Sequence, residues 1–281
     1  MSAIPHEDAP RRRLLIYRHR LVVRITHWIN VLCIAVLLMS GMQIFNAHPA
    51  LYVGQRSQFD HPVLAMGAAD DGGAQPVGVT TILGHDFTTT GVLGVSREHG
   101  ELVERGFPSW ATLPSYQDLA TGRRWHFFFA WLFVANGLVY LAWSLTSGHL
   151  RELVPSGEQL RHIGRSIWEH LRLRFPRGDE ARHYNVLQKL AYFGIVVIVL
   201  PLLVLAGLTM SPGIDAAFPW LVELFGGRQT ARTIHFICAT LVMLFVVVHV
   251  VMVLVSGLFN NLRSMITGNY AIDPEEKPDA H

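Results

Sequence analysis

Four histidines within apolar stretches of the chain are the residues whose type and spacing point most directly to chemistry: His27, His126, His235 and His249. Two of them, His235 and His249, lie fourteen residues apart in one apolar run. In an α-helix this spacing gives a rise of about 21 Å and leaves the two side chains within about 40° of one another around the axis. A compact zinc or iron site needs ligands that converge on one ion, so histidines this far apart serve different sites. The spacing therefore favours two stacked haems, each held by imidazoles from facing helices.

The composition indicates that these histidines lie in a membrane, where an ionisable side chain is costly. Of 281 residues, 51% are hydrophobic and only 16% are charged, which is too apolar for an ordinary soluble domain and typical of a membrane protein. Ionisable side chains inside a bilayer are costly and are usually functional. Taken one at a time, each histidine is equally well explained as a packing residue or a proton relay. The other histidines fall in connections or at their ends, where we expect most of them to be solvated.

Four stretches are long and apolar enough to cross a bilayer as α-helices. We expect these transmembrane segments at residues 21–45, 123–147, 187–209 and 234–258. The two cysteines, Cys33 and Cys238, fall inside them, and the absence of a CxxCH motif argues against covalently attached haem. The predicted fold class is all-α, an integral membrane four-helix bundle that binds two haems b and carries a long periplasmic loop and amphipathic surface helices.

The distribution of arginine predicts the orientation of this bundle. Most arginines outside the spans lie in segments 1–20 and 148–186, and few lie in segments 46–122 and 210–233. By the positive-inside rule, the N-terminal arm, the second connection and the tail at 259–281 are cytoplasmic. The first and third connections are then periplasmic loops. A formal net charge of +2, concentrated in the two basic segments, gives no reason to expect a nucleic-acid partner.

This orientation sorts the four histidines by their depth in the membrane. His27 and His249 fall in the cytoplasmic half, whereas His126 and His235 fall at the periplasmic ends of their segments. A haem held by two imidazoles needs one ring on each face of the iron, from different helices, and each depth-matched couple supplies this. We therefore expect two haems b, with the axial ligand pairs His27/His249 and His126/His235.

Basic side chains near these histidines suit the propionate groups of haem. The candidates are Arg24 for the cytoplasmic haem and Arg123, Arg124 and Arg232 for the periplasmic haem. The alternative for each arginine is simple anchoring at the membrane interface.

The connections between the spans carry further predictions. The first, at 46–122, is either a flexible linker or a platform for a partner outside the membrane. Apolar residues at helical intervals between 160 and 175 predict an amphipathic helix on the inner membrane surface, and residues 218–225 predict a shorter one on the outer side.

Several short motifs carry a resemblance to a known family. They are Arg24-Ile-Thr-His27-Trp28, His235-x13-His249, Tyr184-Asn185-Val-Leu-Gln188-Lys189, Gly207-Leu-Thr and Asn260-Asn-Leu-Arg263-Ser-Met-Ile-Thr-Gly268. Together they resemble the prokaryotic cytochrome b561 family, and within it the thiosulfate-reductase-type and hydrogenase-type diheme cytochrome b membrane subunits. The resemblance extends from about residue 17 to 270 and is weakest in the first loop.

The resemblance implies an electron-transfer subunit of a membrane-bound oxidoreductase complex in a respiratory chain of the bacterial inner membrane. Such a subunit passes electrons between the quinone pool and a periplasmic redox enzyme, and the family favours a molybdopterin-type enzyme as this partner. Its ligand pattern falls on the four histidines that membrane depth selected. Relatives hold quinone beside the cytoplasmic haem through polar side chains at the start of the third span, which here are Asn185 and Gln188. Two amides one helical turn apart can hydrogen-bond quinone carbonyls, although helix capping and a solvated interface position explain them equally well.

Two other functions fit parts of the sequence. A partner-independent diheme oxidoreductase of the same fold would react with quinone and superoxide, but the acidic first loop is poorly suited to attract a small anion. A haem-free membrane proton relay or transporter would use the histidines as proton carriers. We therefore expect electron transfer, and we assign no catalytic residue to the chain itself.

Overall fold

The computed structural model describes residues 14–70, 72–73, 75–149, 157, 161 and 186–272. Contacts divide the chain into two compact units: one comprises residues 28–139 and 195–245, and the other comprises residues 1–27, 140–194 and 246–281. We call them the loop-bearing unit and the terminal unit, because the first contains the long connection after the first span and the second contains both chain ends.

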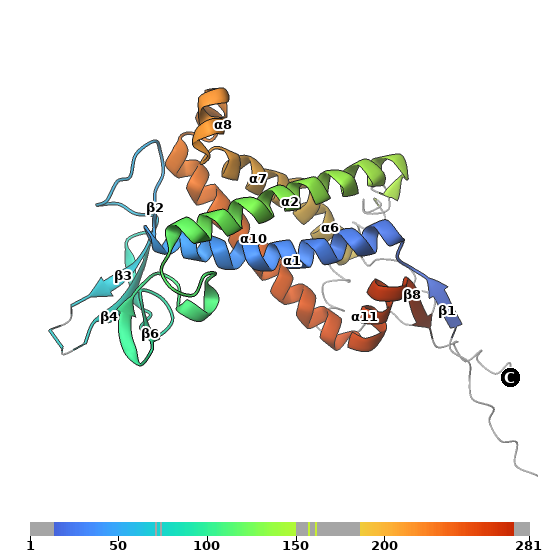
Figure 1. Cartoon of the computed structure of the whole chain (residues 1–281), viewed down its shortest axis with the longest axis horizontal. Helices are drawn as coiled ribbons and strands as arrows, with labels where there is room; N and C mark the ends of the chain where they lie inside the picture. Colours follow the sequence, from blue (N-terminus) through green and yellow to red (C-terminus); the bar gives the residue numbers. More distant parts are fainter. Residues whose placement is uncertain are drawn as a thin grey trace, which may run out of the picture. The chain divides into compact units, whose positions relative to one another are not determined.

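Four long apolar helical runs account for the hydropathy of the chain. They are α1 (Leu21–Asn46), α2 (Leu119–Thr146), the run Val186–Leu208 and α10 (Arg228–Val255). Each has the length and composition needed to cross a bilayer. They confirm the prediction of an integral membrane protein with four spanning helices, whose ribbons can be followed in Figure 1.

The third run is not a uniform α-helix. It consists of α6 (Val186–Phe193), the π-helical segment η3 (Gly194–Val199) and α7 (Leu200–Leu208). Pro201 lies in the first turn of α7 and has no N–H, so it cannot donate to the carbonyl four residues earlier. The wider turns of η3 accommodate this missing hydrogen bond.

The second span begins at Leu119, earlier than the predicted segment at 123–147, because Asp118 caps the helix. The Asp118 carboxylate accepts a hydrogen bond from the backbone N–H of Thr121 at 3.1 Å. The hydroxyl and backbone N–H of Thr121 hold the pKa of Asp118 below its usual value. A capping residue thus adds a turn to the helix ahead of its apolar part.

The first connection of the loop-bearing unit is built of paired strands, for which the sequence analysis predicted no regular structure. The strands β2 (Ala50–Leu51), β3 (Leu64–Ala69), β4 (Val77–Ile82) and β5 (His85–Thr88) form an antiparallel sheet in that order. A separate hairpin consists of β6 (Val95–Glu98) and β7 (Glu101–Glu104), and the short helix η1 (Ser109–Ala111) follows it. The linker interpretation therefore does not describe this segment.

A buried arginine ties this connection to the end of α1. The Arg105 guanidinium is 2% exposed and forms an ion pair with Glu98 at 2.8 Å. It also donates to the backbone carbonyls of Phe107 and Ser115, and to the side-chain oxygens of Thr112 and Gln43. Each polar group of this cluster thus gains a partner in place of water.

A strap at residues 48–57 ties the same connection to the start of α10. The Thr233 hydroxyl donates to the carbonyl of Tyr52 at 2.7 Å, and the carbonyl of Gly54 accepts from the backbone N–H groups of Gln229 and Thr230. The first turn of a helix has N–H groups without partners in the helix, and this carbonyl satisfies two of them. The strap therefore extends α10 to Arg228, six residues before the predicted start at 234.

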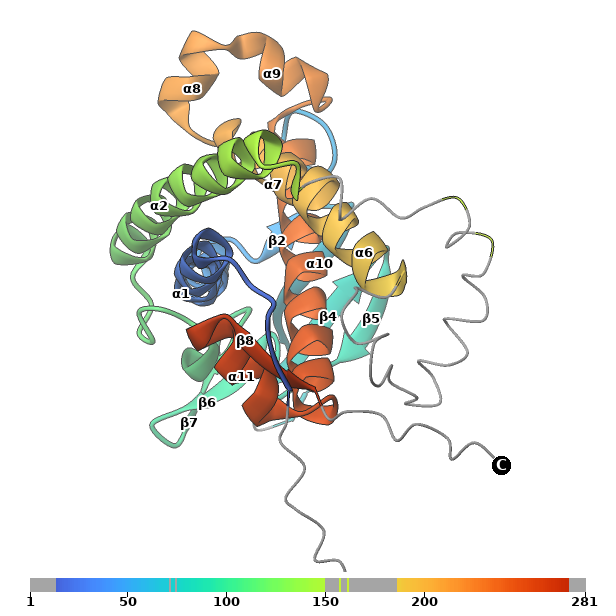
Figure 2. The same ribbon diagram turned by 90° about the vertical axis from the view of Figure 1, so that its right-hand side faces the viewer.

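The third connection contains two short helices, α8 (Pro212–Ala217) and α9 (Pro219–Leu224), which lie next to each other in Figure 2. In α9, Leu221 is buried, whereas the apolar side chains of Trp220 and Leu224 are exposed. A helix is thus present at most of the predicted segment 218–225. The amphipathic helix predicted between 160 and 175 lies outside the described residues, apart from Arg161.

The terminal unit pairs a strand near the start of the described residues with one near their end. β1 (Leu14–Tyr17) pairs antiparallel with β8 (Asn269–Ile272), which follows α11 (Leu258–Thr267). The Asn260 side chain of α11 bonds both backbone groups of Ala271, so α11 and β8 lie side by side (Figures 1 and 2). Gly268 has a φ of 89°, and a Cβ there would lie 2.5 Å from the Tyr17 ring, so this turn requires glycine.

Candidate functional site

In the loop-bearing unit, His126 of α2 faces His235 of α10. The centroids of the two rings are 6.3 Å apart and the ring planes are inclined by 66°. The two residues were predicted to share a site because both lie at the periplasmic ends of spans that run in the same direction across the membrane.

In the terminal unit, His27 of α1 faces His249 of α10 in the same manner. Their ring centroids are also 6.3 Å apart, with an angle of 59° between the planes. The structure thus brings the four histidines together in the two predicted couples. Their role as ligands stays a prediction.

Both separations fit a bis-imidazole haem. A ligating imidazole nitrogen lies about 2 Å from its metal and about 1 Å from its own ring centre, so two rings across one metal have centroids about 6 Å apart. Directly packed rings in a core are often closer, since aromatic pairs begin at about 4.5 Å. Within the described part of the chain, no group of three or more His, Cys, Asp or Glu side chains is able to hold a metal ion. The two facing couples each offer two imidazoles, as a bis-imidazole haem requires.

The outer nitrogens of the loop-bearing pair have defined partners. His235 Nδ1 lies 2.9 Å from the backbone carbonyl oxygen of Leu203, and His126 Nδ1 lies 3.1 Å from the Ser40 hydroxyl. Both leave Nε2 as the nitrogen available to a metal. A ligating histidine usually bonds its second nitrogen in this way. Ser40 was not predicted from the sequence to lie near a histidine.

Two helical glycines lie against the same two rings. A Cβ added at Gly41 would lie 3.4 Å from Cε1 of His126, and one at Gly207 would lie 3.1 Å from Cε1 of His235. A side chain at Gly207 would therefore compete with the ring for space. The Gly207-Leu-Thr motif was noted in the sequence, but its contact with a histidine was not predicted.

Three of the four predicted propionate partners lie on the same helix face as a histidine. Arg24, Arg123 and Arg232 each precede a histidine by three residues, which places both side chains on one helix face. The Arg232 guanidinium donates to the His48 carbonyl at 2.6 Å and lies over the Phe45 ring.

The remaining arginines differ in their surroundings. Arg123 lies over the Phe127 ring and, like Arg124, is exposed. The Arg24 guanidinium donates to the carbonyl of Ile266, and its buried Nε has no hydrogen-bond partner among the residues that the structure describes. The repeated Arg-x-x-His spacing is a signal that the sequence analysis did not use.

Of the two amides predicted to bind quinone, the structure describes only Gln188. Gln188 is partly buried on α6, and Asn185 lies outside the described residues. Their juxtaposition is therefore still a prediction.

His19, expected to be solvated, is instead partly buried in the terminal unit. Burial, together with the positive charge of Arg18, lowers the pKa of His19 to about 4. His19 is therefore uncharged at neutral pH. The prediction of a solvated side chain was wrong here because β1 and the start of α1 pack against the turn at Gly268, whose carbonyl accepts from the His19 N–H.

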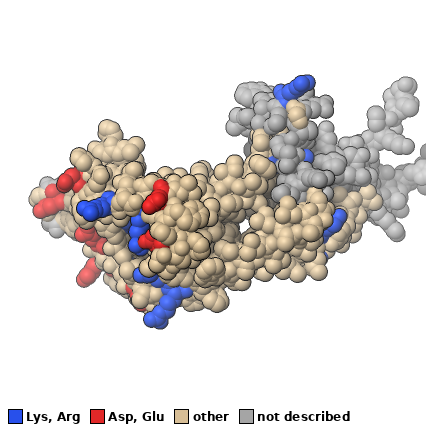
Figure 3. All heavy atoms as spheres, turned by 90° about the horizontal axis from the view of Figure 1, so that it is seen from above, with Lys and Arg blue, Asp and Glu red and all other residues tan. Residues whose placement is uncertain are grey.

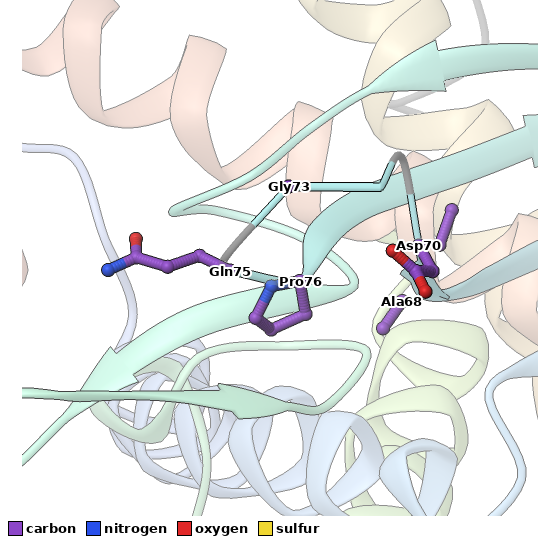
Figure 4. Close-up of a pocket in the computed structure, with 6 residues that line it drawn as sticks. Ala68, Asp70, Gly73, Gln75 and Pro76 are labelled. Atoms are coloured by element: carbon purple, nitrogen blue, oxygen red, sulfur yellow. The ribbon is translucent and has the colours of Figure 1, made fainter.

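A shallow hollow lies at the turn between β3 and β4, lined by Ala68, Ala69, Asp70, Gly73, Gln75 and Pro76 (Figure 4). None of the four histidines lines it. Its small and exposed side chains offer no buried polar group, so we assign it no role.

Comparison with known proteins gives two matches. A family model described as prokaryotic cytochrome b561 matches residues 18–268. A putative protein-methionine-sulfoxide reductase subunit, YedZ1, from Azospira oryzae (strain ATCC BAA-33 / DSM 13638 / PS) is 30% identical over 233 residues, which cover 82% of this chain and 87% of that protein. No solved structure matches the chain significantly.

Proposed function

The chain belongs to the prokaryotic cytochrome b561 family of haem b membrane proteins, and we propose that it passes electrons across the inner membrane between the quinone pool and a periplasmic oxidoreductase. The observation that carries this proposal is the pair of facing histidine couples, each with ring centroids 6.3 Å apart. Haem, when bound, supplies one-electron redox chemistry. The chain supplies the ligands, their orientation and the charge around them.

His27 with His249, and His126 with His235, are the proposed axial ligands of two haems b. The hydrogen bonds at Nδ1 of His126 and His235 orient those two rings and raise the electron density on Nε2. One site takes its ligands from α1 and α10, and the other takes them from α2 and α10. Each site is therefore complete only when its two helices are packed against each other.

Arg24, Arg123, Arg124 and Arg232 are the proposed partners of the haem propionates. A buried carboxylate is stable only when it is paired or hydrogen-bonded, and a guanidinium provides both interactions. Arg232 uses one N–H group toward His48, and a guanidinium has five such donors, so it retains others for a carboxylate.

Quinone is proposed to bind beside the cytoplasmic haem at Asn185 and Gln188. Two amide side chains one turn apart match the two-ended polarity of a quinone, whose carbonyls accept hydrogen bonds. Direction of electron flow follows from the partner, since the same ligands serve quinol oxidation and quinone reduction.

The partner is proposed to be a periplasmic reductase, of the molybdopterin type that the family resemblance favours. The relative from Azospira oryzae is named as a subunit of a protein-methionine-sulfoxide reductase, which suggests a reductase of oxidised methionine for this chain as well. The strand-built first connection suits docking because it presents exposed aromatic side chains, including Phe59 and Trp110. Figure 3 shows acidic and basic side chains interspersed at this end of the molecule, rather than a positively charged patch of the kind that would attract superoxide to a partner-independent enzyme.

The ligand assignment is tested by counting haems in purified variants. We expect about two haems b per chain in the unaltered protein, from reduced-minus-oxidised spectra and pyridine haemochrome assay, and about one in His249→Ala or His235→Ala. His85→Ala, on the exposed strand β5, serves as the control and should retain both. Retention of both haems in His249→Ala would remove His249 from the ligand set, and a haem-free unaltered protein would leave only the proton-relay function.

The partner is tested by co-purification from membranes solubilised in mild detergent. A periplasmic oxidoreductase that is recovered with the chain, and that is reduced when quinol is added, supports the proposal. Quinol-dependent reduction of haem without any such enzyme, together with rapid reduction of superoxide by the isolated chain, would instead support the partner-independent function.

A further inference from the structure

Ser40 of α1 makes the most specific polar contact in the loop-bearing unit that ligand binding alone does not explain. Its side chain is completely buried, and its Oγ lies 3.1 Å from Nδ1 of His126. A buried hydroxyl in a membrane span needs a partner, and a histidine ring is an unusual one to find by chance.

The other contacts of the hydroxyl give this hydrogen bond its direction. Ser40 Oγ lies 2.6 Å from the carbonyl oxygen of Val36, one turn earlier in α1, and 3.3 Å from that of Leu37. A hydroxyl has one hydrogen, and a carbonyl can only accept, so Ser40 donates to Val36. Its oxygen is then left to accept the hydrogen of His126 Nδ1. This arrangement fixes the tautomer in which Nε2 carries the free electron pair.

The two histidines of this pair differ in what holds their outer nitrogens. His235 bonds a backbone carbonyl, that of Leu203, whereas His126 bonds the Ser40 side chain as well as the backbone of Leu37. A Cβ added at Gly41, next to Ser40, would lie 3.4 Å from Cε1 of His126, so this part of α1 passes close to the ring. Of these three acceptors, the Ser40 hydroxyl is the one that a substitution can remove without moving the backbone.

We propose that Ser40 is a positioning residue that holds His126 in the ligating tautomer and lowers the redox potential of the haem bound there. This inference rests on the proposed function. An acceptor at Nδ1 draws the hydrogen toward itself and makes the ring a more basic ligand. A more basic ligand favours the ferric state over the ferrous state.

The test is a potentiometric titration of the purified diheme protein carrying Ser40→Ala. We expect one of its two components to shift toward the ferrous form by about threefold to tenfold in the ferrous-to-ferric ratio at a given applied potential, the size expected for a single lost hydrogen bond. At 59 mV per tenfold for a one-electron couple, this is an upward shift of about 30 to 60 mV. The second component should not move.

Two further variants separate positioning from packing. Ser40→Thr keeps the hydroxyl and should restore the unaltered potential. Ser144→Ala removes an equally buried serine from α2 in the terminal unit and should leave the component of the His126 haem in place. The ferric low-spin signal in electron paramagnetic resonance should change for one haem in Ser40→Ala and return to its original position in Ser40→Thr.

The results distinguish this inference from the ligand assignment on which it rests. Both haems present and neither potential moved in Ser40→Ala would overturn the role of Ser40 alone. Equal shifts of both components, or equal haem loss in Ser40→Ala and Ser40→Thr, would reduce Ser40 to a packing residue. Retention of both haems in His126→Ala would overturn the ligand assignment itself.

Discussion

Gly207 and Gly41 lie close to the rings of His235 and His126, respectively. The two positions differ in the distance that an added Cβ would have from the ring. We expect Gly207→Ala to reduce haem content from about two toward one per chain, because the new Cβ would lie 3.1 Å from Cε1 and 3.2 Å from Nδ1 of His235. A ring displaced by a few tenths of an ångström also weakens its bond to the Leu203 carbonyl. Haem content is measured by the pyridine haemochrome assay.

Gly41→Ala provides the matched control for this change. Its Cβ would lie 3.4 Å from Cε1 of His126, which is ordinary van der Waals contact, so we expect the haem to be retained. If the two variants lose haem equally, the effect comes from helix packing in general rather than from the His235 ring.

The four histidines were found from the sequence because membrane spans make ionisable residues conspicuous and because depth limits their pairing. Ser40 and Gly207 were not identified as neighbours of the rings. They lie on α1 and α7, and the rotation of these helices toward His126 and His235 depends on side-chain packing that a hydropathy pattern does not contain. The ligands of such a site are therefore easier to predict than the groups that orient them.

The β6–β7 hairpin and the segment up to Ser115 depend on the buried side chain of Arg105. We expect Arg105→Met to destabilise this segment by about 1–3 kcal/mol, since it leaves the partly buried Glu98 carboxylate and the buried Gln43 side-chain oxygen without this donor. The change is measured as faster proteolysis within residues 95–118 of the detergent-solubilised protein.

Arg97→Met, on the same hairpin, is the control for Arg105→Met. Arg97 is exposed and has a weak contact of 3.4 Å with the Gly100 carbonyl, so its loss should change stability by no more than about 0.5 kcal/mol. Equal protease sensitivity of the two variants would mean that the buried cluster does not stabilise the segment.

The strands of the first connection were not predicted because the turns between them have unusual sequences. Leu83-Gly84 joins β4 to β5 and His99-Gly100 joins β6 to β7, and both residues of each turn have positive φ. Two-residue turns of this kind usually begin with Asn, Asp or Gly, and leucine is rare there. A sequence rich in Gly and Thr without the usual turn signal is therefore easily mistaken for an irregular loop.

The four spanning helices followed directly from the length and apolarity of their segments, which is why the class of the whole molecule was predicted correctly. Their ends were less predictable. Asp118 begins α2 and the Gly54 carbonyl supports the first turn of α10, and both interactions lie outside the apolar segments that define a span. Hydropathy locates the part of a helix that lies in the bilayer, and capping decides where the helix itself begins and ends.

The arginine distribution predicts that the first connection faces the periplasm and that α11 lies on the cytoplasmic side. Single cysteines at exposed Asp86 of β5 and exposed Thr267 of α11 test this orientation. We expect a membrane-impermeant maleimide to label Asp86→Cys in intact spheroplasts, and to label Thr267→Cys only after the membrane is opened. The unaltered protein serves as the background control, because its two thiols, Cys33 and Cys238, are buried within spans. Labelling of Thr267→Cys in intact spheroplasts would mean that the predicted orientation is reversed. The strands of the first connection would then face the cytoplasm, and a periplasmic reductase would have to dock on the opposite side of the membrane from them.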